Sequence, residues 1–170
     1  MNTAPATVTV RHARPGDYAE IARITVDSYL HAGHFDDPTH PYLGRVRQVA
    51  DRHDATDIWV AERDGRVVGS VTVVRHGNEY ADVALEHELE FRMLVVDPAA
   101  QRSGAGAALL DAVVAHARTL EGVSAVSLTT GRDWAAAHAL YRKAGFRHVP
   151  ERDWYVPDTD ILLLVFVLDL

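Results

Sequence analysis

The 170-residue sequence contains no cysteine. This absence excludes disulfide bonds, thiolate-rich metal sites and a cysteine nucleophile, and it is compatible with a reducing cytoplasm. The sequence also lacks an apolar run that could cross a bilayer. The longest, Ile161–Leu168, is far shorter than the roughly 20 residues that a transmembrane helix needs. We therefore expect a cytoplasmic protein without a membrane partner.

Clusters of positive charge are missing as well. The chain has 17 lysine and arginine residues against 24 aspartate and glutamate residues, a net charge of −7, so nucleic acid is not an expected partner. Hydrophobic residues make up 48% of the chain, too many for a disordered tail. Length and composition predict a single domain over residues 7–170, after a flexible N-terminus, residues 1–6, without signal-peptide character.

The stretch Glu90–Gly106 organises the rest of the chain. Its first part is an apolar strand. The strand ends at Pro98, because proline has no backbone N–H to donate to the hydrogen bonds of a sheet. A polar turn follows, and Gly104 and Gly106 then open a long helix. The amide groups and the dipole at a helix N-terminus attract anions, and Arg102 adds a full positive charge. We therefore predict a phosphate site at this turn.

The spacing in the turn distinguishes between phosphate ligands. A kinase-type P-loop needs lysine and then serine or threonine after its last glycine, and neither glycine here is followed by such a pair. A dinucleotide fingerprint needs a small residue where Leu109 stands, and an acidic residue closing the next strand, where none is found. The run Gln101-x-x-Gly104-x-Gly106 instead matches the acyl-CoA pyrophosphate motif Q/R-x-x-G-x-G/A.

A second motif lies about 30 residues downstream of the first. It reads Ala137-x-x-Leu140-Tyr141-x-x-x-Gly145-Phe146. With both motifs the chain resembles the GNAT superfamily of N-acetyltransferases, most weakly over residues 28–57, which in that family line the acceptor pocket. The resemblance implies an α/β fold with a central mixed sheet of about seven strands and helices on both faces. It implies acetyl-CoA as cosubstrate, no metal, and a small-molecule or peptide amine as acceptor, and it leaves a homodimer open.

The resemblance also assigns residues to the cofactor. The central strand would hydrogen-bond the pantetheine arm through its backbone, as an added strand does, and a bulge there would aim a main-chain N–H at the thioester carbonyl. The expected cofactor residues are Leu94, Val95, Val96, Gln101, Arg102, Ser103, Gly104, Ala105, Gly106 and Ala107. Ser103 replaces a second basic residue of the family. Trp134 replaces an asparagine and is expected to pack on the pantetheine instead.

Two kinds of side chain are candidates for the acid and base. Tyr141 stands where the family has a phenol that protonates the leaving thiolate, and its reference pKa of about 10 keeps it protonated at neutral pH. The alternative is a packed tyrosine whose hydroxyl binds a carbonyl. Glu86, Glu88 and Glu90 share one face of a strand, where their repulsion is expected to raise their pKa. Glu90 is the predicted base and Glu88 the second candidate, with a solvated strand end as the alternative.

The same residues leave other functions to consider. The histidines and aspartates between His31 and His40 match no standard zinc spacing, so no metal site is predicted. A non-catalytic acyl-CoA sensor that kept the turn, or an acyltransferase for a longer acyl group, stays open. The absence of cysteine favours direct attack by the amine in a ternary complex over an acyl-cysteine intermediate.

The remaining patterns predict the order of the elements. Asp64-Gly65 between two apolar runs is a strong hairpin signal. Helices are expected over residues 43–52 and 105–120 and from about residues 17 and 133, and strands over residues 7–11, 57–62, 66–74, 86–96, 125–129, 146–149 and 160–168. The unit around the phosphate turn should be a right-handed parallel crossover.

Overall fold

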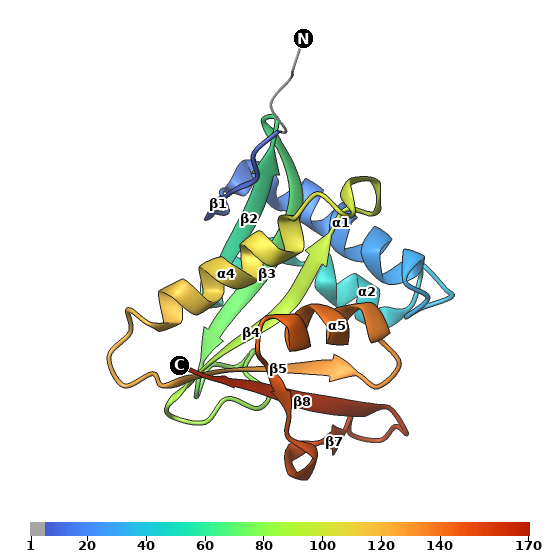
Figure 1. The fold of residues 1–170 in the computed structure, drawn as a ribbon. Helices are drawn as coiled ribbons and strands as arrows, with labels where there is room; N and C mark the ends of the chain where they lie inside the picture. Colours follow the sequence, from blue (N-terminus) through green and yellow to red (C-terminus); the bar gives the residue numbers. More distant parts are fainter. Residues whose placement is uncertain (1–5) are drawn as a thin grey trace. The chain divides into compact units, whose positions relative to one another are not determined.

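The computed structural model describes residues 6–170, and residues 1–5, most of the predicted flexible N-terminus, lie outside the described residues. In chain order the elements are β1 (Thr9–His12), η1 (Pro15–Asp17), α1 (Tyr18–His31), α2 (Pro41–Val46), α3 (Val49–Ala55), β2 (Asp57–Arg63), β3 (Arg66–Arg75), β4 (Glu88–Val96), η2 (Pro98–Ala100), α4 (Ala105–Ala117), β5 (Ala125–Gly131), α5 (Ala135–Lys143), β6 (Arg147–His148), η3 (Pro150–Arg152), β7 (Trp154–Tyr155) and β8 (Leu162–Asp169). Within this part of the chain, eight strands pair in the order β1-β2-β3-β4-β5-β8-β6, with β7 on β8 (Figure 1). This mixed sheet confirms the predicted α/β class.

The chain forms two compact units, and β3, β4 and α4 contribute to both. The first unit ends at Thr72 and is completed by Met93–Ala112; the second consists of Val73–Arg92 and Val113–Leu170. The phosphate turn therefore lies in the first unit. The predicted acid and bases lie in the second.

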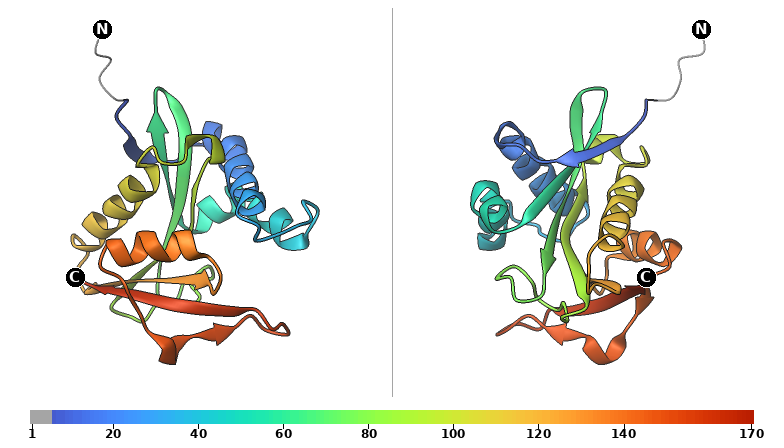
Figure 2. Two further views of the ribbon diagram at one scale, coloured as in Figure 1. Left: turned by 45° about the vertical axis from the view of Figure 1, so that its right-hand side comes forward. Right: turned by 90° about the vertical axis from the view of Figure 1, so that its left-hand side faces the viewer.

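In the first unit, helices α1, α2 and α3 cover one face of β2 and β3, and the start of α4 covers the other (Figure 2, right). The helical spacing of α1 buries Ile21 and Ile24 in two apolar clusters. Ile21 packs in a cluster with Ile58 of β2, and Ile24 in a cluster with Leu43 of α2 and Val95 of β4. These contacts attach α1 to the strand that leads into the phosphate turn.

The predicted hairpin is confirmed, and the predicted helix over residues 43–52 is wrong. Asp64 and Gly65 both have positive φ, 52° and 74°, as a two-residue hairpin turn requires. Instead of one helix there are two, α2 and α3, separated at Gln48, whose ψ is 63°. Buried Arg52 donates to the carbonyl of Val46 (3.1 Å), which a continuous helix would have bound to a backbone amide.

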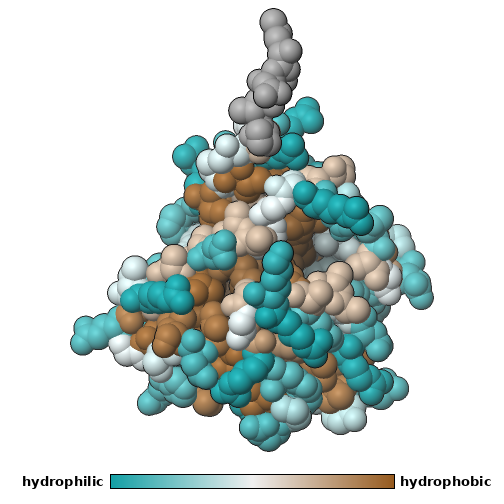
Figure 3. Space-filling view, in the orientation of Figure 1, coloured by the Kyte–Doolittle hydropathy of each residue, from teal (hydrophilic) through white to brown (hydrophobic). Residues whose placement is uncertain are grey.

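In the second unit, α5 lies over β5 and β8 (Figure 2, left). β4 pairs with β5 in parallel, from Glu88 opposite Ala125 to Glu90 opposite Ser127, as expected for a parallel crossover. β5 pairs with β8 in antiparallel fashion along its whole length. Its other edge is therefore paired with β4 over three residues only. Over β5 and β8 the surface mixes hydrophilic and hydrophobic side chains (Figure 3).

Three boundaries in the second unit differ from the prediction. Glu86 lies in a turn closed by the bond from Glu88 N–H to the Leu85 carbonyl (2.9 Å), so it does not share the strand face. Helix α4 ends at Ala117, because Thr119 turns its amide and hydroxyl onto the carbonyl of the preceding turn. The residue at the N-cap of helix α5 is Trp134 and not residue 133, and the Trp134 side chain makes no capping hydrogen bond.

Gly69 of β3 allows β3 to lie close to both β4 and α4. A Cβ at this position would lie 2.9 Å from the carbonyl oxygen of Val95 and 3.2 Å from Leu109. Gly69→Ala should therefore lower the free energy of unfolding by about 1–3 kcal/mol, the range for overpacking. Gly44→Ala is the control, because open space surrounds Gly44 in α2 and alanine there should be neutral or stabilising. Urea unfolding that gives both variants the same stability would contradict this packing.

Candidate active site

The turn between β4 and α4 is open and built on left-handed residues. Arg102 and Gly104 have φ of 62° and 84°. Gln101, Arg102 and Gly104 are exposed. No atom would lie within 4 Å of a Cβ at Gly104, so free space borders the turn at that point. A ligand can therefore approach this backbone closely.

The start of α4 offers unpaired amides to that space. The first α-helical bond of this end runs from the Ala108 N–H to the Gly104 carbonyl (3.0 Å). The Ala105 N–H is taken by the hydroxyl of Ser103 (3.3 Å), so Ser103 caps the helix. The N–H groups of Gly106 and Ala107 have no carbonyl one turn back and point out of the N-terminus. Together with the helix dipole they form an anion-binding arrangement.

Strand β4 is irregular just before the turn. Met93, in the middle of the strand, has a φ of 52°, a conformation that a non-glycine residue adopts at a bulge. Val95 is buried, whereas Leu94 and Val96 are half-buried on either side of it. A bulge was expected near Leu94 and Val95, and the left-handed residue precedes them by one position. No sequence signal pointed to Met93, because methionine is not a residue that favours this conformation.

An arginine of α1 holds the beginning of the turn. Arg23 donates to the carboxylate of Asp97 (2.7 Å) and also pairs with Glu20 and Asp27 on its own helix. The Arg23 guanidinium holds the pKa of the Asp97 carboxyl below its ordinary value. Asp97 also accepts the Ala99 N–H (3.0 Å). Arg23 thus fixes the turn relative to α1, a role with no sequence signature.

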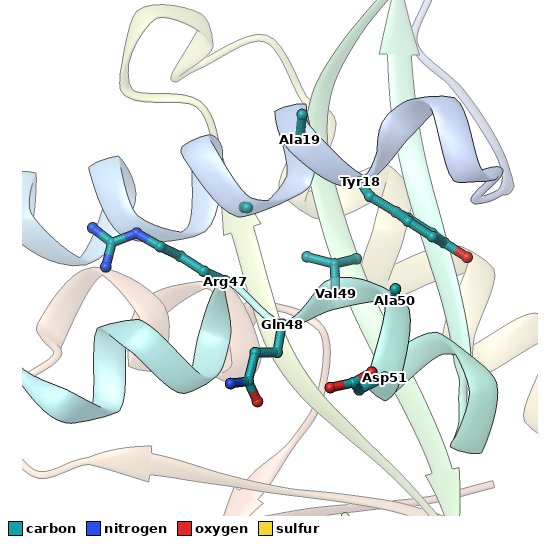
Figure 4. Close-up of a pocket in the computed structure, with 8 residues that line it drawn as sticks. Tyr18, Ala19, Arg47, Gln48, Val49, Ala50 and Asp51 are labelled. Carbon is teal, nitrogen blue, oxygen red and sulfur yellow. The ribbon is translucent and has the colours of Figure 1, made fainter.

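Two surface hollows lie in the first unit. The larger, about 930 Å³, reaches the turn at Asp97 and Ala100 and is lined by charged side chains of both signs. The smaller, about 310 Å³, lies between α1 and the junction of α2 and α3 (Figure 4). There Val49 points toward α1 and Gln48 points away from it. Both come from the segment that was expected to line the acceptor pocket.

In the second unit, Tyr141 projects from α5 into an aromatic cluster. Its ring lies 5.8–6.2 Å from the rings of Phe91, Phe146 and Phe166, and the residue is 7% exposed. Burial raises the pKa of the phenol above its ordinary value, so it stays protonated at neutral pH. Its hydroxyl has no hydrogen-bond partner within residues 6–170. A buried tyrosine hydroxyl usually finds a partner, so this one is available to a ligand.

Glu88 forms a buried ion pair. Both of its oxygens accept bonds from the guanidinium of Arg152 (2.7 and 2.9 Å), and it also accepts the Leu85 N–H (3.1 Å). Burial alone would raise the pKa of the Glu88 carboxyl, but these hydrogen bonds outweigh it and lower the pKa. Glu88 is therefore ionised at neutral pH. The expected mutual rise of the carboxylate pKa values does not occur here, because Arg152 neutralises this charge.

Glu90 lies one pleat further along β4 and is fully buried. It accepts the N–H groups of Asp82, Val83 and Ala84, at 2.9–3.1 Å. Burial raises the pKa of the Glu90 carboxyl, and the three N–H groups offset that rise only in part. A raised pKa suits a base near neutral pH, whereas full burial means that a proton must arrive through water or a small displacement.

Trp134 begins α5 as a half-buried residue packed on β5. Its indole ring covers Gly131 so closely that a Cβ there would lie 2.5 Å from it. Only glycine at position 131 leaves room for this ring. The expected stacking of Trp134 on pantetheine stays a prediction.

Neither a metal site nor a membrane span is found in the described part of the chain. No three histidine, aspartate or glutamate side chains within residues 6–170 come together as metal ligands would. Across the same residues, every helix is too short or too polar to cross a bilayer.

Comparison with known proteins places the chain in a family. The model of the Acetyltransferase (GNAT) domain matches residues 54–148, more than half of the chain. The chain belongs to the GNAT superfamily of acetyltransferases. The matched span of this GNAT domain includes the phosphate turn, Glu90 and Tyr141. Membership confirms the resemblance seen in the two motifs and supports acetyl-CoA as the cosubstrate.

Curated relatives of this GNAT domain include an acetyltransferase and a synthetase of an N-acetylated amino acid. The mycothiol acetyltransferase of Cellulomonas flavigena is 34% identical over 163 residues, covering 90% of this chain and 44% of the relative. The human N-acetylaspartate synthetase is 32% identical over 117 residues, covering 69% of this chain and 36% of the relative. The chain thus spans less than half the length of these two relatives.

Solved structures show the same fold. The ribosomal-protein-alanine N-acetyltransferase of Brucella melitensis superposes with a TM-score of 0.70 at 24% identity, over 95% of this chain and 99% of that one. A Salmonella typhimurium protein solved with its cofactor acetyl-CoA superposes with a TM-score of 0.69 at 22% identity, over 96% of this chain and 94% of that one.

Proposed function

We propose that this GNAT domain transfers an acetyl group from acetyl-CoA to the amine of a small molecule or peptide, by direct attack in a ternary complex. The observation that carries the proposal is the early end of the β4–β5 pairing, after Glu90 and Ser127. Beyond that point β4 has, within residues 6–170, no strand partner on the β5 side. An extended pantetheine arm carries amide groups and can pair with this edge of β4, at Leu94–Val96, as an added strand.

The cofactor residues follow from the same arrangement. The amides of Gly106 and Ala107, with Arg102, would hold the pyrophosphate, and the turn from Gln101 to Ala105 would shape its seat. The backbone of Leu94–Val96, directed by the left-handed Met93, would bind pantetheine and polarise the thioester carbonyl. Trp134 would pack on the pantetheine from α5.

We assign the acid to Tyr141 and the base to Glu90. The amine nitrogen attacks the thioester carbon, and the carbon–sulfur bond breaks as the tetrahedral intermediate collapses. The departing thiolate takes the proton of the Tyr141 hydroxyl, which is protonated and unpartnered. The ammonium proton passes to Glu90 through water, because that carboxylate is fully buried. The lack of any cysteine supports direct attack over an acyl-enzyme.

Free-thiol release from acetyl-CoA against a panel of amines tests the proposal. The panel includes aspartate, because one relative is named N-acetylaspartate synthetase. It also includes a peptide that begins with alanine, because one structural neighbour is named ribosomal-protein-alanine N-acetyltransferase. Release that depends on one amine supports transfer. A chain that binds acetyl-CoA and releases no thiol with any amine would be the non-catalytic sensor.

Glu90→Gln should remove the acid limb of the pH profile. If Glu90 must be ionised to take a proton, kcat/KM rises with pH through its folded pKa, and burial places that pKa above the ordinary value. Glutamine takes no proton, so activity should recover only at high pH, where the amine loses its proton unaided, at a reference pKa of about 10.4 for a lysine-like acceptor. The measurement is kcat/KM across pH for both proteins.

Glu88→Gln is the matched control, two residues back on the same strand. Because Arg152 lowers the pKa of the Glu88 carboxyl, Glu88 does not itself produce the limb, which should persist in this variant even where it shifts with the lost ion pair. If the Glu88 variant loses the limb and the Glu90 variant keeps it, the base is Glu88. If neither variant changes it, the limb belongs to the substrate.

A further inference from the structure

Arg152 connects three separate parts of the second unit. It ends η3, 64 residues along the chain from Glu88. One guanidinium nitrogen donates to a Glu88 oxygen (2.7 Å), and the other donates both to the second Glu88 oxygen (2.9 Å) and to the carbonyl of Val83 (2.7 Å). The planar fork of arginine suits this pattern, because two donors are directed in parallel at one carboxylate.

The contact to Val83 lies in a segment that also binds Glu90. Residues 82–85, hereafter the 82–85 segment, direct four successive amides at the two glutamates of β4: those of residues 82, 83 and 84 at Glu90, and that of Leu85 at Glu88. Val83 is therefore held at its N–H by Glu90 and at its carbonyl by Arg152. Its side chain packs against the apolar cluster of β5, β8 and Val149.

We propose that Arg152 is a positioning residue for acetyl transfer: by binding Glu88 and the Val83 carbonyl together, it holds the 82–85 segment so that its amides fix the carboxylate of Glu90. This inference rests on the proposed function, because it deepens the role given there to Glu90. Arg152 itself touches neither the cofactor turn nor a reacting atom.

Other charged groups lie near Glu88 and Glu90 besides Arg152. They are Asp82 on the segment, which pairs with Arg92 of β4 (3.3 Å), His87, whose Nε2 lies 4.0 Å from Glu88, and Glu151 beside Arg152. Arg92 also donates to the Tyr80 carbonyl (2.6 Å), so it holds the loop at Tyr80 and at the Asp82 side chain, whereas Arg152 holds the backbone at Val83. Without Arg152, Glu88 would be left as an uncompensated negative charge beside Glu90.

Removing Arg152 should have two effects of the same sign. Glu90 would lose a nearby positive charge and gain an unscreened neighbour of its own sign, and it would lose part of its N–H donors as the segment loosens. Each change favours the protonated carboxyl. The acid limb of kcat/KM should therefore move to higher pH by about one unit in Arg152→Gln, and kcat/KM on the acid side of the limb should fall about tenfold.

The test combines hydrogen exchange of the 82–85 amides with the pH profile. We expect Arg152→Gln to speed hydrogen exchange at these amides and to move the acid limb of kcat/KM to higher pH. Arg152→Lys keeps the positive charge but lacks the planar guanidinium. It should return the acid limb of kcat/KM to its wild-type pH and slow the exchange of the 82–85 amides only in part. It also keeps the inference testable if the glutamine variant fails to fold. Arg147→Gln is the control, because Arg147 forms an exposed pair with Asp169 (3.4 Å), and it should change neither measurement.

Each outcome decides a different point. Unchanged exchange in Arg152→Gln would overturn the inference, because the segment would then be held without Arg152. Faster exchange with an unmoved or lowered limb would also overturn it and leave Arg152 as a stabilising residue only. If the wild-type protein acetylates no amine, the proposed function fails and the role in transfer fails with it, while exchange still reports whether Arg152 holds the segment.

Discussion

Gly104→Asp should weaken acetyl-CoA binding by about a hundredfold or more. A carboxylate roughly 5 Å from a pyrophosphate charge costs about 3 kcal/mol at the effective dielectric constant of a protein surface, and about 1.4 kcal/mol is a factor of ten. The added Cβ contributes further, because Gly104 has a φ of 84°, which side chains with a Cβ rarely adopt. Titration calorimetry with acetyl-CoA gives the two affinities directly.

Gly122→Asp separates repulsion from backbone strain. Gly122 is also exposed, has a φ of 78° and has no atom within 4 Å of a Cβ position, so the strain is matched. It lies between α4 and β5, after the helix has ended. Its variant should bind acetyl-CoA as the wild type does. Equal affinities for the Gly104 variant and the wild type would place the pyrophosphate elsewhere.

Tyr141→Phe should lower kcat by about tenfold or more, with little change in the affinity for acetyl-CoA. Phenylalanine keeps the ring among Phe91, Phe146 and Phe166 and removes only the hydroxyl, which has no partner within residues 6–170. Since no hydrogen bond of the folded chain is lost, a fall in kcat would report chemistry and not stability. Steady-state kinetics with a saturating amine measures it.

Tyr155→Phe controls for losing a hydroxyl elsewhere. Tyr155 lies on β7 and is 60% exposed, and its variant should keep the wild-type kcat. If Tyr141→Phe also keeps it, the thiolate takes its proton from water, and Tyr141 serves only to pack α5 on the sheet.

The parts of the fold that follow from the sequence are those with local causes. The Asp64-Gly65 hairpin rests on two residues that tolerate positive φ, and the strand, turn and helix around Gly104 rest on proline and glycine at fixed offsets. The end of α5 is similar, because Gly145 takes a φ of 96°. In each case the interaction that determines the structure joins residues close together in the sequence, so a short stretch of sequence is enough to predict it.

The parts that could not be predicted depend on side-chain contacts that no local sequence pattern shows. Helix α2 stops where buried Arg52 takes the Val46 carbonyl, a bond between two residues that a continuous helix would have placed differently. The ionisation of Glu88 is decided by Arg152, far along the chain, so spacing on β4 alone suggested the opposite pKa shift. The left-handed Met93 likewise has no local signal, because methionine does not favour a positive φ.

The central claim is direct acetyl transfer to an amine, and following a labelled acetyl group tests it most directly. Acetyl-CoA labelled in the acetyl group is mixed with the protein and the amine that releases the most thiol, and the label is located by mass spectrometry. We predict that it appears on the acceptor nitrogen at the rate of thiol release and never on the protein chain. Label on the protein before the acceptor, or label found only in free acetate, would contradict the account.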